Sequence, residues 1–408
     1  MKSFLIYPVL ITLLLLPGGG ATAADLPGIT DKEIRIGNTG PYSGPASVYS
    51  IMLKSAGAWF DKVNAEGGIN GRKVKFISLD DGYSPPKTKE QVRKLVEKEK
   101  VALIFMSLGT ACNSAVQRYL NRKKVPQLFI ATGASKWNNP GKYPWTMGWQ
   151  GTYDVESEIY AKYILQHRPN AKIAILYQND DFGKDYVAGL ERGLGDQAQK
   201  MIVSREAYEP TDPTVDSQII KMKASGADVF LNIATPKHAS QAIRKVHELK
   251  WQPLQFMTSV SISVAGVMKP VGFDKTQGIL STRYFLDPYD PAHAETKAIK
   301  DWQAFMKEYY PEGDRKNAFN VYGYLVAQTL EHVLRRAGND LSRENIMKQA
   351  ASLKDFAPAA MVPGITLNTS STDYRPVESM ELIRFKGDRW HGIGQMIRSG
   401  NDMKGIAH

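Results

Sequence analysis

Apolar runs of strand length that stop at small polar residues alternate with helical segments along most of the chain. Residues 101–106 (Val-Ala-Leu-Ile-Phe-Met) lead into residues 107–114 (Ser-Leu-Gly-Thr-Ala-Cys-Asn-Ser), and residues 127–131 lead into residues 132–135 (Thr-Gly-Ala-Ser). Alternating strand and helix signals predict parallel sheets. The carboxyl ends of parallel strands lie at the same edge of the sheet, and open α/β sheets bind their ligands at this edge. Small hydroxyl residues and backbone amides at that edge suit a small anion. The pattern therefore predicts an α/β protein that holds a ligand.

The alternation occurs twice along the 408 residues. It stops at an aperiodic aromatic segment, residues 143–153, and restarts with the strand-like run of residues 172–177. Two successive α/β units of similar plan predict two lobes with a cleft between them, and the chain length is sufficient for two domains.

The first 24 residues differ from the rest of the chain. Lys2 precedes an apolar run at residues 4–16, and small residues 18–24 provide a cleavage site near Ala23 and Ala24. An apolar run of about 13 residues is too short to span a bilayer of roughly 30 Å. We expect a cleaved signal peptide and a periplasmic protein, with an N-terminal anchor helix as the alternative.

Charge and cysteine content exclude some functions. The formal net charge is +11, but Lys and Arg alternate with Glu over residues 87–100, which is typical of a solvated helix face and not of a nucleic-acid site. We expect no nucleic-acid partner. The single cysteine, Cys112, excludes an intramolecular disulfide; we interpret it as a small buried residue at a helix start, with a reactive thiol as the alternative.

Motifs for catalysis or cofactor binding are missing from the sequence. It contains no H-E-x-x-H, no G-x-S-x-G and no G-x-x-x-x-G-K-[ST], and its histidines are scattered. We expect no metal, no organic cofactor and no enzymatic activity. Acid pairs at residues 80–81 and 180–181 allow a remote alternative, a secreted hydrolase with a carboxylate dyad, but Asp at such positions more often caps a helix.

Several motifs together resemble one family. They are residues 34–45 (Ile-Arg-Ile-Gly-Asn-Thr-Gly-Pro-Tyr-Ser-Gly-Pro), residues 63–73 (Val-Asn-Ala-Glu-Gly-Gly-Ile-Asn-Gly-Arg-Lys) and residues 181–183 (Asp-Phe-Gly). In order and spacing, they resemble the periplasmic solute-binding proteins of branched-chain amino-acid ABC transporters. The resemblance covers the whole mature chain, and the motif at residues 63–73 is the most specific.

This resemblance implies a leucine-binding-protein-like type I fold. Two Rossmann-like lobes would be joined by three hinge crossings near residues 149–152, 280–285 and 361–367, with the ligand in the cleft between the lobes. Lobe one would comprise residues 25–149 and 285–364, and lobe two residues 150–284 and 365–408.

The resemblance also implies site residues. Backbone amides and hydroxyls of Gly109, Thr110, Gly133 and Ser135 would hold a ligand carboxylate, and free N–H groups at a helix start independently favour an anion. The family's aromatic contacts would fall on Tyr49 and Phe182, and another contact, usually a Tyr, on Thr235. For Tyr49 and Phe182, simple packing is the alternative.

One position departs from the family pattern. Amino-acid binders of the family place a Glu of lobe two against the ligand ammonium, and Val260 occupies that position here. A buried ammonium without an acidic partner is costly, although Asp154, Asp180 or Asp181 could substitute. Trp149 and Tyr153 would add flat apolar walls to the site, or would only brace the crossing.

From these features we expect an ABC-importer binding protein that closes on a small carboxylate, an aromatic or apolar acid in preference to an amino acid. It would be a monomer that delivers its ligand to a membrane permease. Branched-chain amino-acid binding and a ligand sensor of the same fold are the alternatives.

Overall fold

The computed structural model describes residues 26–398, so the predicted signal peptide lies outside the described residues. The described chain forms two sheets. The first is entirely parallel, in the order β2-β1-β3-β4-β5. Its strands are β1 (Glu33–Gly40), β2 (Lys73–Asp80), β3 (Leu103–Phe105), β4 (Gln127–Ile130) and β5 (Thr146–Gly148).

The second sheet has the order β12-β11-β10-β9-β8-β6-β7, parallel except for β11 and β12. Its strands are β6 (Ile173–Gln178), β7 (Ile202–Tyr208), β8 (Val229–Ile233), β9 (Leu254–Met257), β10 (Leu280–Arg283), β11 (Ser379–Lys386) and β12 (Arg389–Arg398). The antiparallel pair at the end of the chain was not predicted from the sequence.

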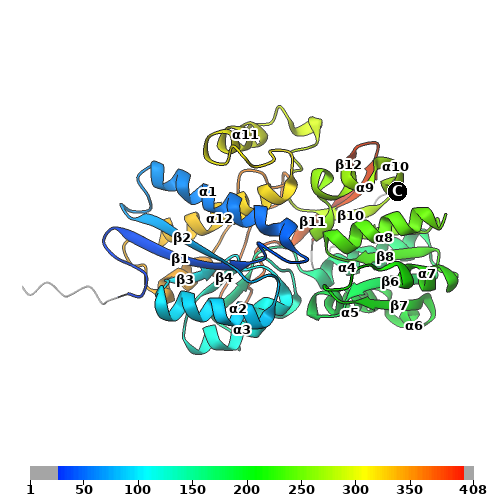
Figure 1. Ribbon diagram of the computed structural model, residues 1–408, viewed down its shortest axis with the longest axis horizontal. Coiled ribbons are helices and arrows are strands. Elements are labelled where there is room, and N and C mark those ends of the chain that lie inside the picture. Colours follow the sequence, from blue (N-terminus) through cyan, green and yellow to red (C-terminus); the bar gives the residue numbers. More distant parts are fainter. Residues whose placement is uncertain (1–25, 399–408) are drawn as a thin grey trace, which may run out of the picture.

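Helices cover both sheets (Figure 1). With the first sheet lie α1 (Ser50–Ala65), α2 (Pro85–Arg93), α3 (Thr110–Arg122), α11 (Lys297–Tyr309), α12 (Ala318–Ala337) and α13 (Arg343–Ala350). With the second lie α4 (Tyr153–His167), α5 (Asp181–Leu194), α6 (Ala198–Met201), α7 (Asp216–Ala224), α8 (Pro236–Glu248), α9 (Lys269–Val271) and α10 (Phe273–Thr276). We call the first sheet with its helices lobe one and the second lobe two; the two lie side by side in Figure 1.

Local sequence explains these elements. Strands β3 and β4 are completely buried and, apart from Gln127, apolar, as expected for central strands covered on both faces by helices. Helix α12 is buried along most of its length, and a Cβ on Gly323 would lie 2.0 Å from the carbonyl oxygen of Met52, so a glycine is needed where α12 meets α1. Strand β1 continues to Gly40, because residues 38–40 pair with residues 78–80 of β2.

Within the described residues the chain passes between the lobes three times: after β5, after β10 and after α13. The last two passages are bonded to each other. Phe285 pairs with Met361, and the Val362 N–H donates to the carbonyl oxygen of Tyr284 over 3.0 Å. The predicted fold class, two α/β lobes with three crossings, is therefore confirmed; the exact lobe boundaries stay a prediction. No described helix combines the length and apolar character needed to cross a membrane.

Candidate ligand-binding cavity

A cavity of about 620 Å³ lies between the two lobes. Seven of the residues predicted from the sequence line it: Tyr49, Gly109, Thr110, Tyr153, Phe182, Thr235 and Val260. They come from both lobes, which places the cavity at the predicted cleft.

Helix α3 presents its first turn to the cavity. The helix begins after Gly109, which has no side chain to cap the first N–H groups, and Thr110 lines the cavity beside it. Gly109 adopts φ +97°, and a Cβ there would lie 2.6 Å from the Tyr83 ring, so glycine is required on both counts. Uncapped amides at a helix start, with the positive end of the helix dipole, favour an anion.

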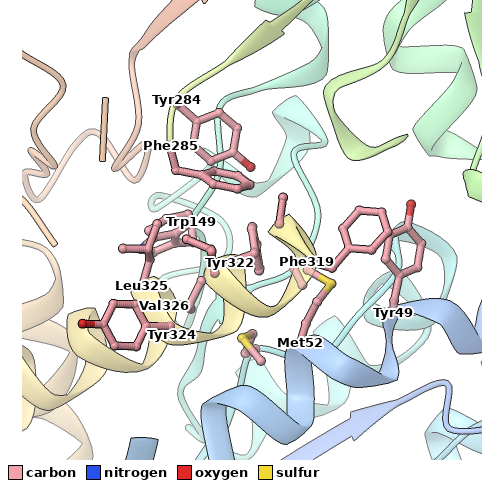
Figure 2. Packing of buried hydrophobic residues seen from close by; sticks show 14 of the residues in the cluster. Tyr49, Met52, Trp149, Tyr284, Phe285, Phe319, Tyr322, Tyr324, Leu325 and Val326 are labelled. Atoms are coloured by element: carbon pink, nitrogen blue, oxygen red, sulfur yellow. The ribbon is translucent and has the colours of Figure 1, made fainter. Parts of the chain in front are cut away.

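Aromatic rings form much of the remaining wall. Tyr49, directly before α1, and Met52 of α1 extend toward Phe319 of α12, and Tyr284 and Phe285 lie at the nearby crossing (Figure 2). The rings of Tyr49 and Phe319 meet edge to face with 5.2 Å between centroids. These walls suit a flat or apolar ligand body.

No charged side chain lines the cavity in the part of the chain that the structure describes. Behind the wall, bonded to the lining residue Ser259, lies the carboxylate of Glu156, which is completely buried. It accepts hydrogen bonds from the Ser259 amide (2.7 Å), the Ser259 hydroxyl (2.6 Å), Tyr186 (2.7 Å) and Tyr160. Burial raises the pKa of Glu156, and these hydrogen bonds oppose the rise. Glu156 therefore fixes Ser259 in the wall and has no acceptor left for a ligand.

The three candidates to replace the missing Glu lie outside the cavity lining. Asp180 caps α5, accepting from the N–H groups of Phe182 (3.0 Å) and Gly183 (3.3 Å), and burial raises its pKa. Asp154 pairs with Arg192 over 2.8 Å. Asp181 pairs with Lys136 over 2.6 Å.

Three predicted site residues do not line the cavity. The carbonyl oxygen of Gly133 accepts a 2.8 Å hydrogen bond from the Tyr153 N–H. Trp149 is fully buried, donates to Thr329 over 2.9 Å and packs against Tyr284, so it braces the crossing. Ser135 is bonded to Asp185 of α5.

Direct hydrogen bonds join the lobes around the cavity. The Tyr49 hydroxyl donates to the carbonyl oxygen of Val260 over 2.9 Å. In the opposite direction, from lobe two to lobe one, the Gln178 side-chain amide donates to the Tyr83 hydroxyl over 3.2 Å. The structure therefore has the lobes in contact, with the cavity between them.

The other acidic and thiol groups singled out in the sequence have structural roles. Asp81 accepts from the Tyr83 N–H (3.0 Å) and the Thr88 hydroxyl (2.9 Å). Burial alone would raise the pKa of Asp80, but hydrogen bonds from Ser43 and other donors lower it. Burial raises the pKa of the Cys112 thiol to about 12, which disfavours the reactive thiolate. Among the described residues, no group of acidic, His or Cys side chains has a metal-binding arrangement.

Further lining residues were not predicted from the sequence. Among them are Gln150, Ser259, Ser263, Tyr284, Phe319 and Tyr322. Tyr284 lies within the predicted second crossing, at residues 280–285, so its position at the hinge could have identified it as a cavity residue. Phe319 and Tyr322 begin a helix far along the chain, and no strand end or polar turn marks them.

A two-lobed α/β fold with a cavity between the lobes defines a class of proteins that bind a solute between their lobes. A family model described as "Periplasmic binding protein" matches residues 33–389, and the chain belongs to this family. This membership confirms the resemblance seen in the sequence.

Individual relatives are distant but match over nearly the full length. Leu/Ile/Val-binding protein homolog 1 of Brucella abortus (strain 2308) is 24% identical over 368 residues, covering 89% of this chain and 91% of the relative. The structure of a branched-chain amino acid ABC transporter protein from Thermus thermophilus with bound valine superposes with a TM-score of 0.81 at 16% identity, covering 90% of this chain and 97% of that one. The fatty acid ABC transporter substrate-binding protein from Thermomonospora curvata gives a TM-score of 0.76 at 19% identity, covering 92% and 95%. At these identities the structural matches establish the fold.

Proposed function

We propose that this protein is an exported solute-binding protein of an ABC importer that captures a small carboxylate-bearing ligand without an α-amino group. One observation carries the proposal: among the described residues the cavity wall combines the uncapped start of α3 with side chains that are all uncharged.

The charge balance separates the two ligand classes. A carboxylate can accept hydrogen bonds from the amides that follow Gly109 and gains from the helix dipole. An ammonium would lose its hydration and meet no free carboxylate, since Glu156 already accepts four hydrogen bonds, and this loss costs several kcal/mol.

The apolar walls favour an aromatic or otherwise apolar acid. Rings from both lobes, including Tyr49, Phe182 and Phe319, surround the space. The fatty acid ABC transporter substrate-binding protein from Thermomonospora curvata supports this choice, because it has the same fold and a fatty acid is a carboxylate without an amine.

Closure of the two lobes would link ligand binding to delivery of the ligand to the permease. A ligand that touches both walls stabilises the closed arrangement, in which Tyr49 reaches Val260. The membrane permease would recognise the closed form and accept the ligand. A sensor output uses the same closure; a permease and an ATPase encoded beside the gene would favour transport.

Branched-chain amino-acid binding is the second candidate. It is favoured by the name of the Brucella relative and by the valine bound in the Thermus structure. It requires an acceptor for the ammonium, which backbone carbonyls of the cavity wall would have to supply.

A ligand screen tests both candidates. Mature protein, unfolded and refolded to remove any bound solute, is heated with benzoate, phenylacetate, cinnamate and medium-chain fatty acids, and separately with leucine, valine and phenylalanine. A ligand that binds only the folded state raises Tm, with about 2.7 kcal/mol of stabilisation at a hundred times its Kd. We expect a rise in Tm with the amine-free acids alone. A rise with leucine or valine alone would replace the proposal by the second candidate.

A further inference from the structure

One hydroxyl in the cavity wall has no partner. Tyr284 follows β10 at the crossing between the lobes, lines the cavity and is only 4% exposed. No hydrogen bond joins its hydroxyl to any described residue. The hydroxyl oxygen is not among the fully buried unpaired atoms, so it is open to the cavity, where a polar group without a protein partner is available to a ligand.

The other polar side chains of the wall are already paired within the protein. Thr110 pairs with Thr132, Thr235 with Tyr208, Ser259 with Glu156, Ser263 with Asn317, Tyr49 with Val260, Tyr83 with Gln178, and Gln150 with Tyr322. The free hydroxyl of Tyr284 is therefore an exception within this wall.

The ring of Tyr284 is held in place. It packs edge to face on Trp149, with 6.0 Å between centroids, and on Phe285 at 5.1 Å. Its backbone oxygen accepts from the Val362 N–H over 3.0 Å, which fixes the crossing segment. Because ring and backbone are both fixed, the hydroxyl cannot turn to a protein partner without disturbing the packing.

The surroundings of this hydroxyl belong to the cavity. Burial raises the pKa of Tyr284, and the nearby hydroxyls of Tyr322, Tyr153 and Tyr49 add to the rise. These neighbours come from α12, α4 and the segment before α1, so the hydroxyl lies where both lobes meet.

We propose that Tyr284 determines ligand specificity by hydrogen bonding to an oxygen-bearing substituent on the ligand, separate from the carboxylate. The assignment rests on the proposed function, in which the carboxylate binds at the start of α3. Tyr284 belongs to a different wall, the crossing braced by Trp149 and Tyr322. The ligand class is then narrower than an apolar acid: it is a hydroxylated or otherwise oxygen-substituted aromatic or apolar acid.

Matched acid pairs test this assignment. Isothermal titration compares benzoate with 3- and 4-hydroxybenzoate, phenylacetate with 4-hydroxyphenylacetate, and cinnamate with 4-hydroxycinnamate. In the wild-type protein we expect the hydroxylated member of at least one pair to bind about tenfold more tightly, as one well-placed hydrogen bond allows. In Tyr284→Phe this preference disappears, so that the two members of the pair bind equally tightly.

Tyr324→Phe is the matched control, since Tyr324 is a buried tyrosine of α12 outside the cavity lining. It should keep the hydroxyl preference. Equal binding within every pair in the wild type, as when a water molecule pairs with Tyr284, overturns the assignment while leaving the acid-binding proposal intact. A preference that survives in Tyr284→Phe also overturns it. Absence of binding by every acid overturns the proposed function and this assignment together. If Tyr284→Phe does not fold, the assignment is tested by the comparison of hydroxylated and unsubstituted acids in the wild-type protein alone.

Discussion

Ser135 binds Asp185 with both of its donors: its N–H and its hydroxyl donate to the two carboxylate oxygens over 2.8 and 2.6 Å. Ser135 follows β4 in lobe one, and Asp185 lies on α5 of lobe two. The resemblance assigned these donors to a ligand carboxylate, and in the structure they hold a carboxylate of the protein itself. Beside them Lys136 pairs with Asp181 of the same helix over 2.6 Å. The loop after β4 is therefore fastened to α5 outside the cavity.

Asp185→Asn should weaken ligand binding although Asp185 does not line the cavity. Hydrogen bonds to a charged group contribute about 1.5–3 kcal/mol, and the amide can keep only part of them, so the closed arrangement loses stability. We expect Kd for the best acid to rise about tenfold by titration calorimetry. Asp196→Asn, an exposed position in the same lobe, is the control. Unchanged affinity in Asp185→Asn would mean that the contact with Ser135 does not support closure.

Gly109→Ala should disturb the anion site. The added Cβ would lie 2.6 Å from the Tyr83 ring and would hold a residue at φ +97°. Gly67→Ala is a close control, since Gly67 has φ +102° and open space around its Cβ position. Both changes should cost about 1–2 kcal/mol of stability from the backbone alone, measured by denaturation. Only Gly109→Ala should also weaken acid binding; equal losses of affinity in the two variants would contradict this role for Gly109.

The fold could be predicted from the sequence because its signals are local. Strands such as β3 and β4 end at small polar residues, and the start of α3 at Gly109 can be identified from the same pattern. The rest of the site depends on contacts between distant residues. Glu156 is bonded to Ser259, 103 positions further along the chain, and only this contact shows that the Glu156 carboxylate is occupied by hydrogen bonds within the protein. The orientation of the Ser135 hydroxyl also cannot be predicted from the local sequence, because its hydrogen-bond partner, Asp185, belongs to the other lobe.

Asp287, at the crossing after β10, should make stability depend on pH. Burial raises its pKa from about 3.8 to about 7, opposed by a 2.8 Å hydrogen bond from the Tyr289 N–H, with Asp290 raising and Arg283 lowering it further. Between these two pKa values the native protein keeps a proton that the unfolded chain has lost. Its stability therefore falls as pH rises, by at most about 1.4 kcal/mol per pH unit, and levels off above pH 7.

Asp287→Asn removes this titration and keeps an acceptor for the Tyr289 N–H. We expect the Tm of the variant relative to wild type to increase steadily from pH 5 to pH 7 and then to stay constant to pH 8. Parallel Tm curves for the two proteins over this range would show that Asp287 ionises equally easily in the folded and unfolded chains.

Val260→Glu tests whether one position sets the choice between acids and amino acids. Val260 is half-buried in the cavity wall, next to Ser259, and its carbonyl oxygen already accepts from Tyr49. A carboxylate there would offer an ammonium the partner that this wall lacks, and would repel a second carboxylate in the same space. We expect affinity for amine-free acids to fall about tenfold or more and leucine or phenylalanine to begin to raise Tm. Val260→Gln has nearly the same size without the charge, so it should lose some acid affinity by crowding without gaining amino-acid binding. If Val260→Glu and Val260→Gln behave alike, side-chain volume and not charge governs ligand choice at this position.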